Sequence, residues 1–161
     1  MDEEPLIRKI LLQLCRDSNY KIRIDSAIIL KEYFSENCHA LLSSPRLQQT
    51  YVPELVEMCS DEQTCIRVEA IEALSSVMEV VEASKLESEV IPALLKIMQS
   101  DYDELIEKLS KFIGKLVFKM SQVGELHLKH KDTILDFFKS LSAHKEDHFR
   151  LTAAFNLPCF Y

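Results

Sequence analysis

The hydrophobic positions of this chain recur at the spacing of an α-helix. Near the amino terminus, Leu6, Ile10 and Leu14 fall on one helical face, together with Ile7 and Leu11. Short polar side chains at 17–19 then favour a turn, because they compete for backbone hydrogen bonds. The same pattern predicts helices over about 5–15, 20–34, 51–59, 64–81, 86–99, 103–120 and 126–141, and one that begins near residue 146. We therefore expect an all-α fold.

The helical pattern also repeats. The segment carrying Cys15, Asp17, Ile22, Arg23 and Leu30 returns 44 residues later as Cys59, Asp61, Ile66, Arg67 and Leu74. A fainter copy follows about 40 residues on, and Phe149-Arg150 matches Ile22-Arg23 in a fourth copy. A fixed period near 40 residues is typical of stacked helix pairs. We expect one right-handed α-solenoid with approximate repeats at 5–34, 45–81, 86–120 and 126–161.

The repeats resemble the HEAT-repeat family. A proline opens the first helix, an aspartate lies in the turn, and a hydrophobic residue followed by arginine opens the second helix. Units with Asp17 and Arg23, and with Asp61 and Arg67, have this motif in full. The resemblance implies a hydrogen-bonded ladder that runs from repeat to repeat through these four side chains, and Asp61 is the proposed partner of Arg67. The third repeat departs with Glu107 for the arginine, and the fourth with His144 for the aspartate.

Within the HEAT family, two stretches are similar to the scaffold and regulatory subunits of the phosphatase 2A group. They are S-D-E-Q-T-C-I-R-V-E-A-I-E-A-L at 60–74 and T-A-A-F-N-L-P-C at 152–159. The resemblance implies a non-catalytic subunit that binds a phosphatase catalytic subunit of the 2A or 4 type along the turns within the repeats. The partner-binding residues expected on those turns are Asp17, Asn19, Tyr20, Lys21, Asp61, Glu62, Gln63, Asp101, Tyr102 and Glu104.

Two alternatives to this interpretation stay open. The turn residues Asp17, Asn19 and Asp61 have side chains that commonly cap a following helix, and capping does not exclude binding. A transport receptor of the importin type would use the same repeats to wrap its cargo, and it would bind a small GTPase and basic localisation peptides.

Charge and composition narrow the classes of partner. The net charge is −7 and the pI is about 5.3, which disfavours nucleic acid as a partner. The basic stripe of Lys108, Lys111, Lys115 and Lys119 fits a solvated helix face. No apolar run reaches the length needed to span a bilayer. The acidic first residues do not form a signal peptide, and five cysteines indicate reduced thiols, so we expect a cytoplasmic or nuclear protein.

Candidate catalytic and metal-binding pairs are weak. The histidine pairs 127/130 and 144/148 lack a third ligand at a recognised spacing, as does the cysteine pair 59/65. Cys38-His39 lacks a recognisable oxyanion donor. We expect no enzymatic activity, metal or cofactor, and we note Ser44-Pro45 as a candidate phosphorylation site.

Two further features concern packing. Gly114 interrupts the helix over 103–120, which indicates a close approach or a bend. The apolar stretch from Ala153 to Tyr161 lacks the polar face of a terminal cap. We therefore expect a segment or short isoform of a longer array, and self-association through Phe155, Phe160 and Tyr161.

Overall fold

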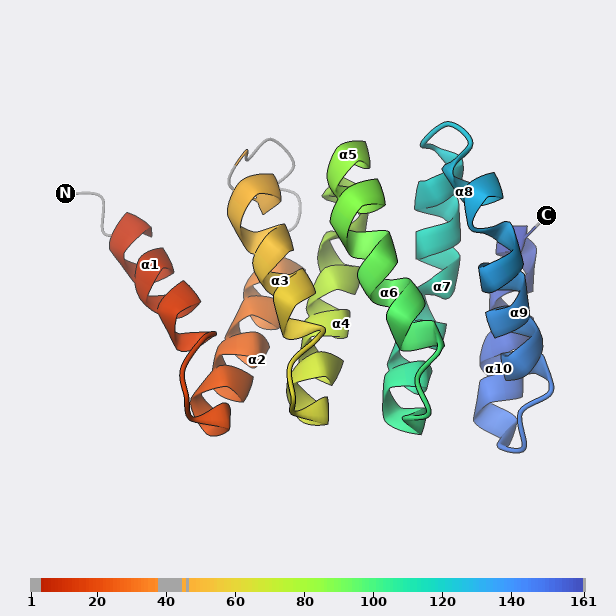
Figure 1. The fold of residues 1–161 in the computed structure, drawn as a ribbon, viewed down its shortest axis with the longest axis horizontal. Helices are drawn as coiled ribbons and strands as arrows, with labels where there is room; N and C mark the ends of the chain where they lie inside the picture. Colours follow the sequence, from red (N-terminus) through yellow and green to blue (C-terminus); the bar gives the residue numbers. More distant parts are fainter. Residues whose placement is uncertain (1–3, 38–44, 46, 161) are drawn as a thin grey trace. The chain divides into compact units, whose positions relative to one another are not determined.

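A computed structural model describes the chain except for residues 1–3, 38–44, 46 and 161. The described residues form helices and turns without a β-strand, which confirms the all-α prediction (Figure 1). Cys38, His39, Ser44 and Tyr161 lie outside the described residues, as does the side chain of Phe160. Within the described part, no helix has both the length and the apolar character that crossing a membrane requires. The chain divides into two compact units, Met1–Val81 and Glu82–Tyr161.

The first unit consists of two antiparallel helical hairpins (Figure 1). The first hairpin pairs α1 (Glu4–Leu14) with α2 (Tyr20–Asn37), and the second pairs α3 (Val52–Met58) with α4 (Thr64–Val77). A π-helical turn, η2 (Leu47–Tyr51), precedes α3, and a 3₁₀ turn, η3 (Met78–Val80), follows α4. Helix α2 packs along α4, so the second helices of the two hairpins form the centre of this unit.

The core of the first unit is built from the apolar faces that the periodicity predicts. Leu30 and Phe34 of α2 are fully buried, as are Ile71 and Leu74 of α4. The Phe34 ring meets that of Tyr51 edge to face, with 5.4 Å between the ring centroids. Such aromatic pairs add to the stabilisation from burial itself. They join α2 to the turn that opens the second hairpin.

The second unit also consists of two helical hairpins, but the first helix of each hairpin is interrupted. A short helix, α5 (Ala83–Lys85), and a π-helical turn, η4 (Leu86–Val90), lead into α6 (Ile91–Met98), which pairs with α7 (Asp103–Ser121). After α8 (Leu126–Lys129), the second hairpin pairs α9 (Lys131–Ser142) with α10 (Asp147–Asn156), and the 3₁₀ turn η5 (Leu157–Phe160) follows. Helix α7 packs along α10.

Two predicted helices differ from the observed ones in this unit. The helix expected over 86–99 begins earlier, at Ala83, and includes the π-helical turn. The helix expected over 126–141 is interrupted at His130, where the backbone leaves the helical region (φ −112°, ψ 11°). Gly124, with a φ of 51°, makes the turn between α7 and α8 in a conformation that favours glycine.

Gly114 marks a close approach of two helices in the second unit. Its N–H donates to Asn156 Oδ1 at 3.2 Å, and Asn156 Nδ2 donates to the Ser110 carbonyl at 3.1 Å. A Cβ atom at position 114 would lie 2.5 Å from that Oδ1 and 2.8 Å from Cys159 Sγ. The missing side chain therefore lets the Asn156 amide reach the backbone of α7. Of the two expectations for Gly114, the close approach is the one observed.

We expect Gly114→Ala to destabilise the protein. At an open helix position this change would stabilise by about 1 kcal/mol. Here the new methyl group collides with an amide held by two hydrogen bonds, and such overpacking costs about 1–3 kcal/mol. Thermal unfolding followed by circular dichroism should show a melting temperature lower by several degrees. Lys115→Ala on an exposed face of the same helix is the control and should shift the melting temperature little. A rise with Gly114→Ala would contradict the close packing.

Candidate functional site

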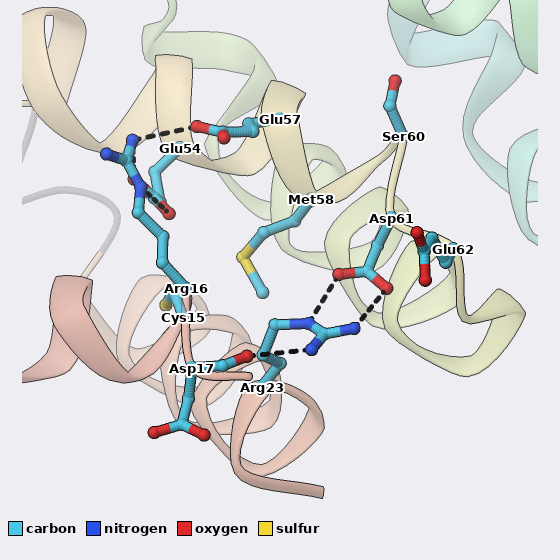
Figure 2. Close-up of a pocket in the computed structure, with 10 residues that line it drawn as sticks. All are labelled: Cys15, Arg16, Asp17, Arg23, Glu54, Glu57, Met58, Ser60, Asp61 and Glu62. Carbon is cyan, nitrogen blue, oxygen red and sulfur yellow. Dashed lines mark hydrogen bonds and ion pairs between the residues drawn. The ribbon is translucent and has the colours of Figure 1, made fainter. Parts of the chain in front are cut away.

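The turns of the two hairpins in the first unit meet around an open pocket of about 460 Å³ (Figure 2). Five carboxylates and two guanidinium groups line it, so its net charge is negative. The lining residues are Cys15, Arg16, Asp17, Arg23, Glu54, Glu57, Met58, Ser60, Asp61 and Glu62. The structure thus brings together the turns that the sequence analysis assigned to partner binding in the first two repeats.

The ion pair between Arg23 and Asp61 joins the two hairpins at this pocket (Figure 2). Arg23 Nε donates to Asp61 Oδ2 at 2.8 Å, and Arg23 Nη2 donates to Asp61 Oδ1 at 3.1 Å. Arg23 Nη1 donates to the carbonyls of Asp17 at 2.8 Å and Ser18 at 3.2 Å. The two side chains are only 15% and 12% exposed. The guanidinium is therefore anchored to its own turn on one edge and holds the next hairpin with the other.

The ion pair joins two repeats, but its arginine is not the one that the sequence analysis paired with Asp61. Arg67 was expected to pair with Asp61, but its Nη2 donates to Thr64 Oγ1 at 2.8 Å. Asp61 takes its two side-chain hydrogen bonds from Arg23 instead. Arg67 still lies close enough to help lower the pKa of Asp61, as the smallest of the contributions.

Further polar contacts between the hairpins, within the part of the chain that the structure describes, follow the same register. Each joins a residue of the first hairpin to one 38 or 41 positions later, and in each ion pair the cation comes from the first hairpin. They are Arg16 with Glu54 (2.8 Å) and Glu57 (2.9 Å), Lys31 with Glu69 and Glu72, and Ser35 with Ser76 (3.1 Å). The sequence analysis did not identify these contacts. The signal that was available is the recurrence of opposite charges at these two separations.

Glu54 is the most buried carboxylate of the pocket. Its side chain is 5% exposed and lies 2.8 Å from Arg16 Nη2, which is itself largely exposed. Burial raises the pKa of Glu54 above its ordinary value, although the hydrogen bond and the charge of Arg16 oppose that rise. Burial likewise raises the pKa of the Cys15 and Cys59 thiols to about 12. Both thiols are therefore protonated at neutral pH and unsuited to act as nucleophiles.

All four hairpin turns use the same local hydrogen bond. In the first unit, Asp17 Oδ1 accepts the Asn19 N–H at 2.7 Å, and Asp61 Oδ1 accepts the Gln63 N–H at 2.9 Å. In the second unit, Ser100 Oγ accepts the Tyr102 N–H at 3.2 Å and His144 Nδ1 accepts the Glu146 N–H at 3.1 Å. A side-chain acceptor two residues before an N–H closes the turn ahead of each second helix.

This hydrogen bond decides the roles of several predicted residues. In the third turn the acceptor is Ser100, whereas Asp101, which was expected to bind a partner, is exposed. Asn19 Oδ1 accepts the Lys21 N–H at 3.0 Å, so Asn19 caps α2 as the structural alternative expected. In the fourth turn His144 stands in place of the aspartate, and its ring nitrogen accepts the same hydrogen bond.

Exposure separates the predicted partner-binding residues into two groups. Most have exposed side chains that are open to contact, namely Asn19, Tyr20, Lys21, Glu62, Gln63, Asp101, Tyr102 and Glu104. Asp17 is half-buried, and Asp61 is occupied by Arg23. Asp101 and Tyr102 belong to the turn between α6 and α7 of the second unit, and Glu104 lies in the first turn of α7.

One of the two histidine pairs, His144 and His148, packs against an aromatic ring. The rings of His144 and His148 lie against Phe149, with ring centroids 4.1 and 4.3 Å from that of the phenylalanine. Within the described residues, no group of three or more histidine, cysteine, aspartate or glutamate side chains has an arrangement that could hold a metal ion.

Comparison with known proteins identifies the fold alone. No family model matches the chain, and no curated protein matches it. Among 37 matching chains of solved structures is a crystal structure of an engineered protein from the Northeast Structural Genomics Consortium. It superposes with a TM-score of 0.68 at 14% sequence identity and covers 92% of this chain. This chain spans 60% of the engineered protein's length.

We expect the Arg23–Asp61 pair to be energetically coupled. Arg23→Ala and Asp61→Ala should each lower the melting temperature by several degrees, because each leaves a partner that is largely shielded from water without its counter-charge. The double variant should melt higher than the sum of the two shifts implies. The exposed pair Lys139 and Asp136 is the control, whose shifts should be small and additive. Additive shifts at Arg23 and Asp61 would rule out the coupling.

Glu54 and Asp61 should give the stability opposite dependences on pH. Burial favours a higher pKa at Asp61, but hydrogen bonds from Arg23 and the Gln63 N–H outweigh it and lower the pKa. Stability from Asp61 is therefore present above about pH 4 and is lost as pH falls below it. The raised pKa of Glu54 acts the other way, so its contribution to stability declines as pH rises above the ordinary pKa of a glutamate.

This difference is measurable with two isosteric variants. As pH falls from 7 to about 3.5, the Asp61→Asn variant should approach the parent protein in melting temperature. Over the same range, the melting temperature of the Glu54→Gln variant should fall relative to that of the parent. Melting temperatures across the pH series report both trends. The same trend in both variants would contradict the opposite pKa shifts.

Proposed function

We propose that this chain is a HEAT-type solenoid segment that acts as a non-catalytic regulatory or scaffold subunit of a serine/threonine protein phosphatase of the 2A or 4 type. Regulatory subunit 4 of protein phosphatase 4 is the specific candidate from the sequence resemblance. The chain would work in the cytoplasm or nucleus by holding the catalytic subunit on the exposed side chains of its hairpin turns.

The observation that carries the proposal is that some turn residues hold the hairpins together while their neighbours stay exposed. Asp61 forms the ion pair that fixes one hairpin on the next, whereas Glu62 and Gln63 beside it are exposed. In the first turn, Tyr20 and Lys21 are likewise exposed beside the anchored Arg23. The backbone under these side chains is fixed, which reduces the entropy lost when a partner binds.

The character of the exposed side chains supports a protein partner. Tyr20 and Tyr102 are exposed on corresponding turns of the two units. Tyrosine is enriched among the residues that dominate binding energy at protein interfaces, and the acidic neighbours Glu62 and Glu104 would steer a basic partner surface.

The test is direct binding of the full chain to purified phosphatase catalytic subunits, measured by biolayer interferometry. We expect Tyr20→Ala with Glu62→Lys, and separately Tyr102→Ala with Glu104→Lys, to weaken binding by roughly tenfold or more. These changes spare Asp61, so the hairpin contact stays intact. Matched controls are Glu36→Lys and Glu125→Lys, which should bind like the parent. Both are exposed acidic residues away from the hairpin turns, Glu36 in the last turn of α2 and Glu125 directly before α8.

Two outcomes would overturn the proposal. Folded chain that binds neither a 2A-type nor a 4-type catalytic subunit would exclude the phosphatase role. Binding to a small transport GTPase and to basic localisation peptides, lost in the turn variants, would establish the importin-type alternative instead.

A further inference from the structure

The last hairpin of the second unit presents an arginine in the same local setting as Arg23. Arg150 Nη1 donates to the carbonyls of His144 at 2.6 Å and Lys145 at 2.8 Å. Those carbonyls lie six and five residues before it, as the carbonyls of Asp17 and Ser18 do before Arg23. Arg150 is therefore anchored to its own turn in the way that prepares Arg23 to hold a carboxylate.

The other edge of the Arg150 guanidinium has a weaker ion-pair partner than that of Arg23. Its Nη2 pairs with Asp147, three residues earlier in the same helix, and the Asp147 side chain is 83% exposed. An exposed pair of this kind contributes little to stability. A carboxylate offered by another hairpin can replace it at small cost, as Asp61 does for Arg23 within the first unit.

The helix face beside Arg150 is apolar and open. Leu151 is 70% exposed and Phe155 is 82% exposed, and both line a shallow pocket with Thr152 and Asn156. Ala154 and Leu157 are exposed as well, although the residues 127 positions earlier, Ala27 and Leu30, are fully buried in the first unit. Apolar residues of α10 and the turn after it are therefore exposed at positions whose counterparts in the first unit are buried.

The first unit offers the matching surface. Asp17 forms the same turn as Asp61, with its Oδ1 accepting the N–H two residues later. On α2, Ile29 and Tyr33 are exposed, while the residues 44 positions later, Ala73 and Val77, are fully buried. The exposed apolar side chains Leu6 and Ile10 of α1 extend this surface. The α1–α2 face therefore offers an aspartate for Arg150 and exposed apolar side chains that can pack against those of α10.

We propose that the α10 face of one copy of this chain docks on the α1–α2 face of a second copy, with Arg150 holding the second copy's Asp17 as Arg23 holds Asp61. The two faces differ, so the contact is head-to-tail and each added copy leaves both faces available again. Charge complementarity between Arg150 and Asp17 selects this orientation over contacts between identical faces, which would bring like charges together.

Sedimentation velocity over about 1–100 µM tests the assembly. The weight-average mass should rise above the 18.6 kDa of one chain as concentration increases. Phe155→Glu should abolish the rise, because it places a charge in the apolar contact. Arg150→Asp and Asp17→Arg should each reduce self-association at least tenfold, because each sets like charges opposite one another. Circular dichroism verifies that all variants are folded.

Mixing the two charge variants provides the decisive measurement. The Arg150→Asp chain and the Asp17→Arg chain cannot assemble with themselves, but the mixture restores opposite charges at every head-to-tail contact. We expect the mixture to regain assembly. Failure of the mixture to assemble, or a parent protein that stays monomeric at about 100 µM, would overturn the proposal. Assembly lost with Phe155→Glu but unchanged in both charge variants would also overturn it, because it would indicate tail-to-tail contact. None of these results depends on phosphatase binding.

Discussion

The arrangement of the first unit depends on one carboxylate. Asp61 closes its own turn by accepting the Gln63 N–H and, through the same carboxyl group, receives Arg23 from the preceding hairpin. The conformation of the turn and the most shielded ion pair between the two hairpins therefore depend on a single group. Because both side chains are largely shielded from water, this charge-assisted contact is stronger than an ion pair on an open surface. The exposed turn residues are positioned by it without taking part in it.

The second unit meets the same requirement with different chemistry. Its helices α7 and α10 are joined by the Asn156 amide, which donates to the Ser110 carbonyl and accepts from the Gly114 N–H. The contact is neutral and meets α7 near its middle, so it needs a position without a side chain there. The ion pair between Lys129 and Glu87 also joins the hairpins of this unit, but both side chains are exposed. Two units with the same hairpin topology thus use a shielded ion pair at the turns in one case and a buried amide directed at the backbone in the other.

Sequence reasoning succeeds here where local chemistry decides and fails where register between hairpins decides. The helices follow from apolar spacing, and the turns at Asp17 and Asp61 follow from short polar side chains, because both depend on residues a few positions apart. The partner of Arg23 does not follow, since Asp61 lies 38 residues away and Arg67 is an equally plausible donor by type. The role of Ser100 was missed because Asp101, its neighbour, matches the motif better.

The polarity of the contacts in the first unit has a consequence for how the chain avoids misfolding. In the ion pairs described between the two hairpins, each cation comes from the first hairpin and each carboxylate from the second. The second hairpin, residues 52–77, carries six carboxylates and one arginine, so two second hairpins from neighbouring chains would repel one another. Second hairpins are therefore poor partners for one another when they meet during refolding at high concentration. The carboxylates that hold the native pair together also discourage the pairing of two second hairpins between chains.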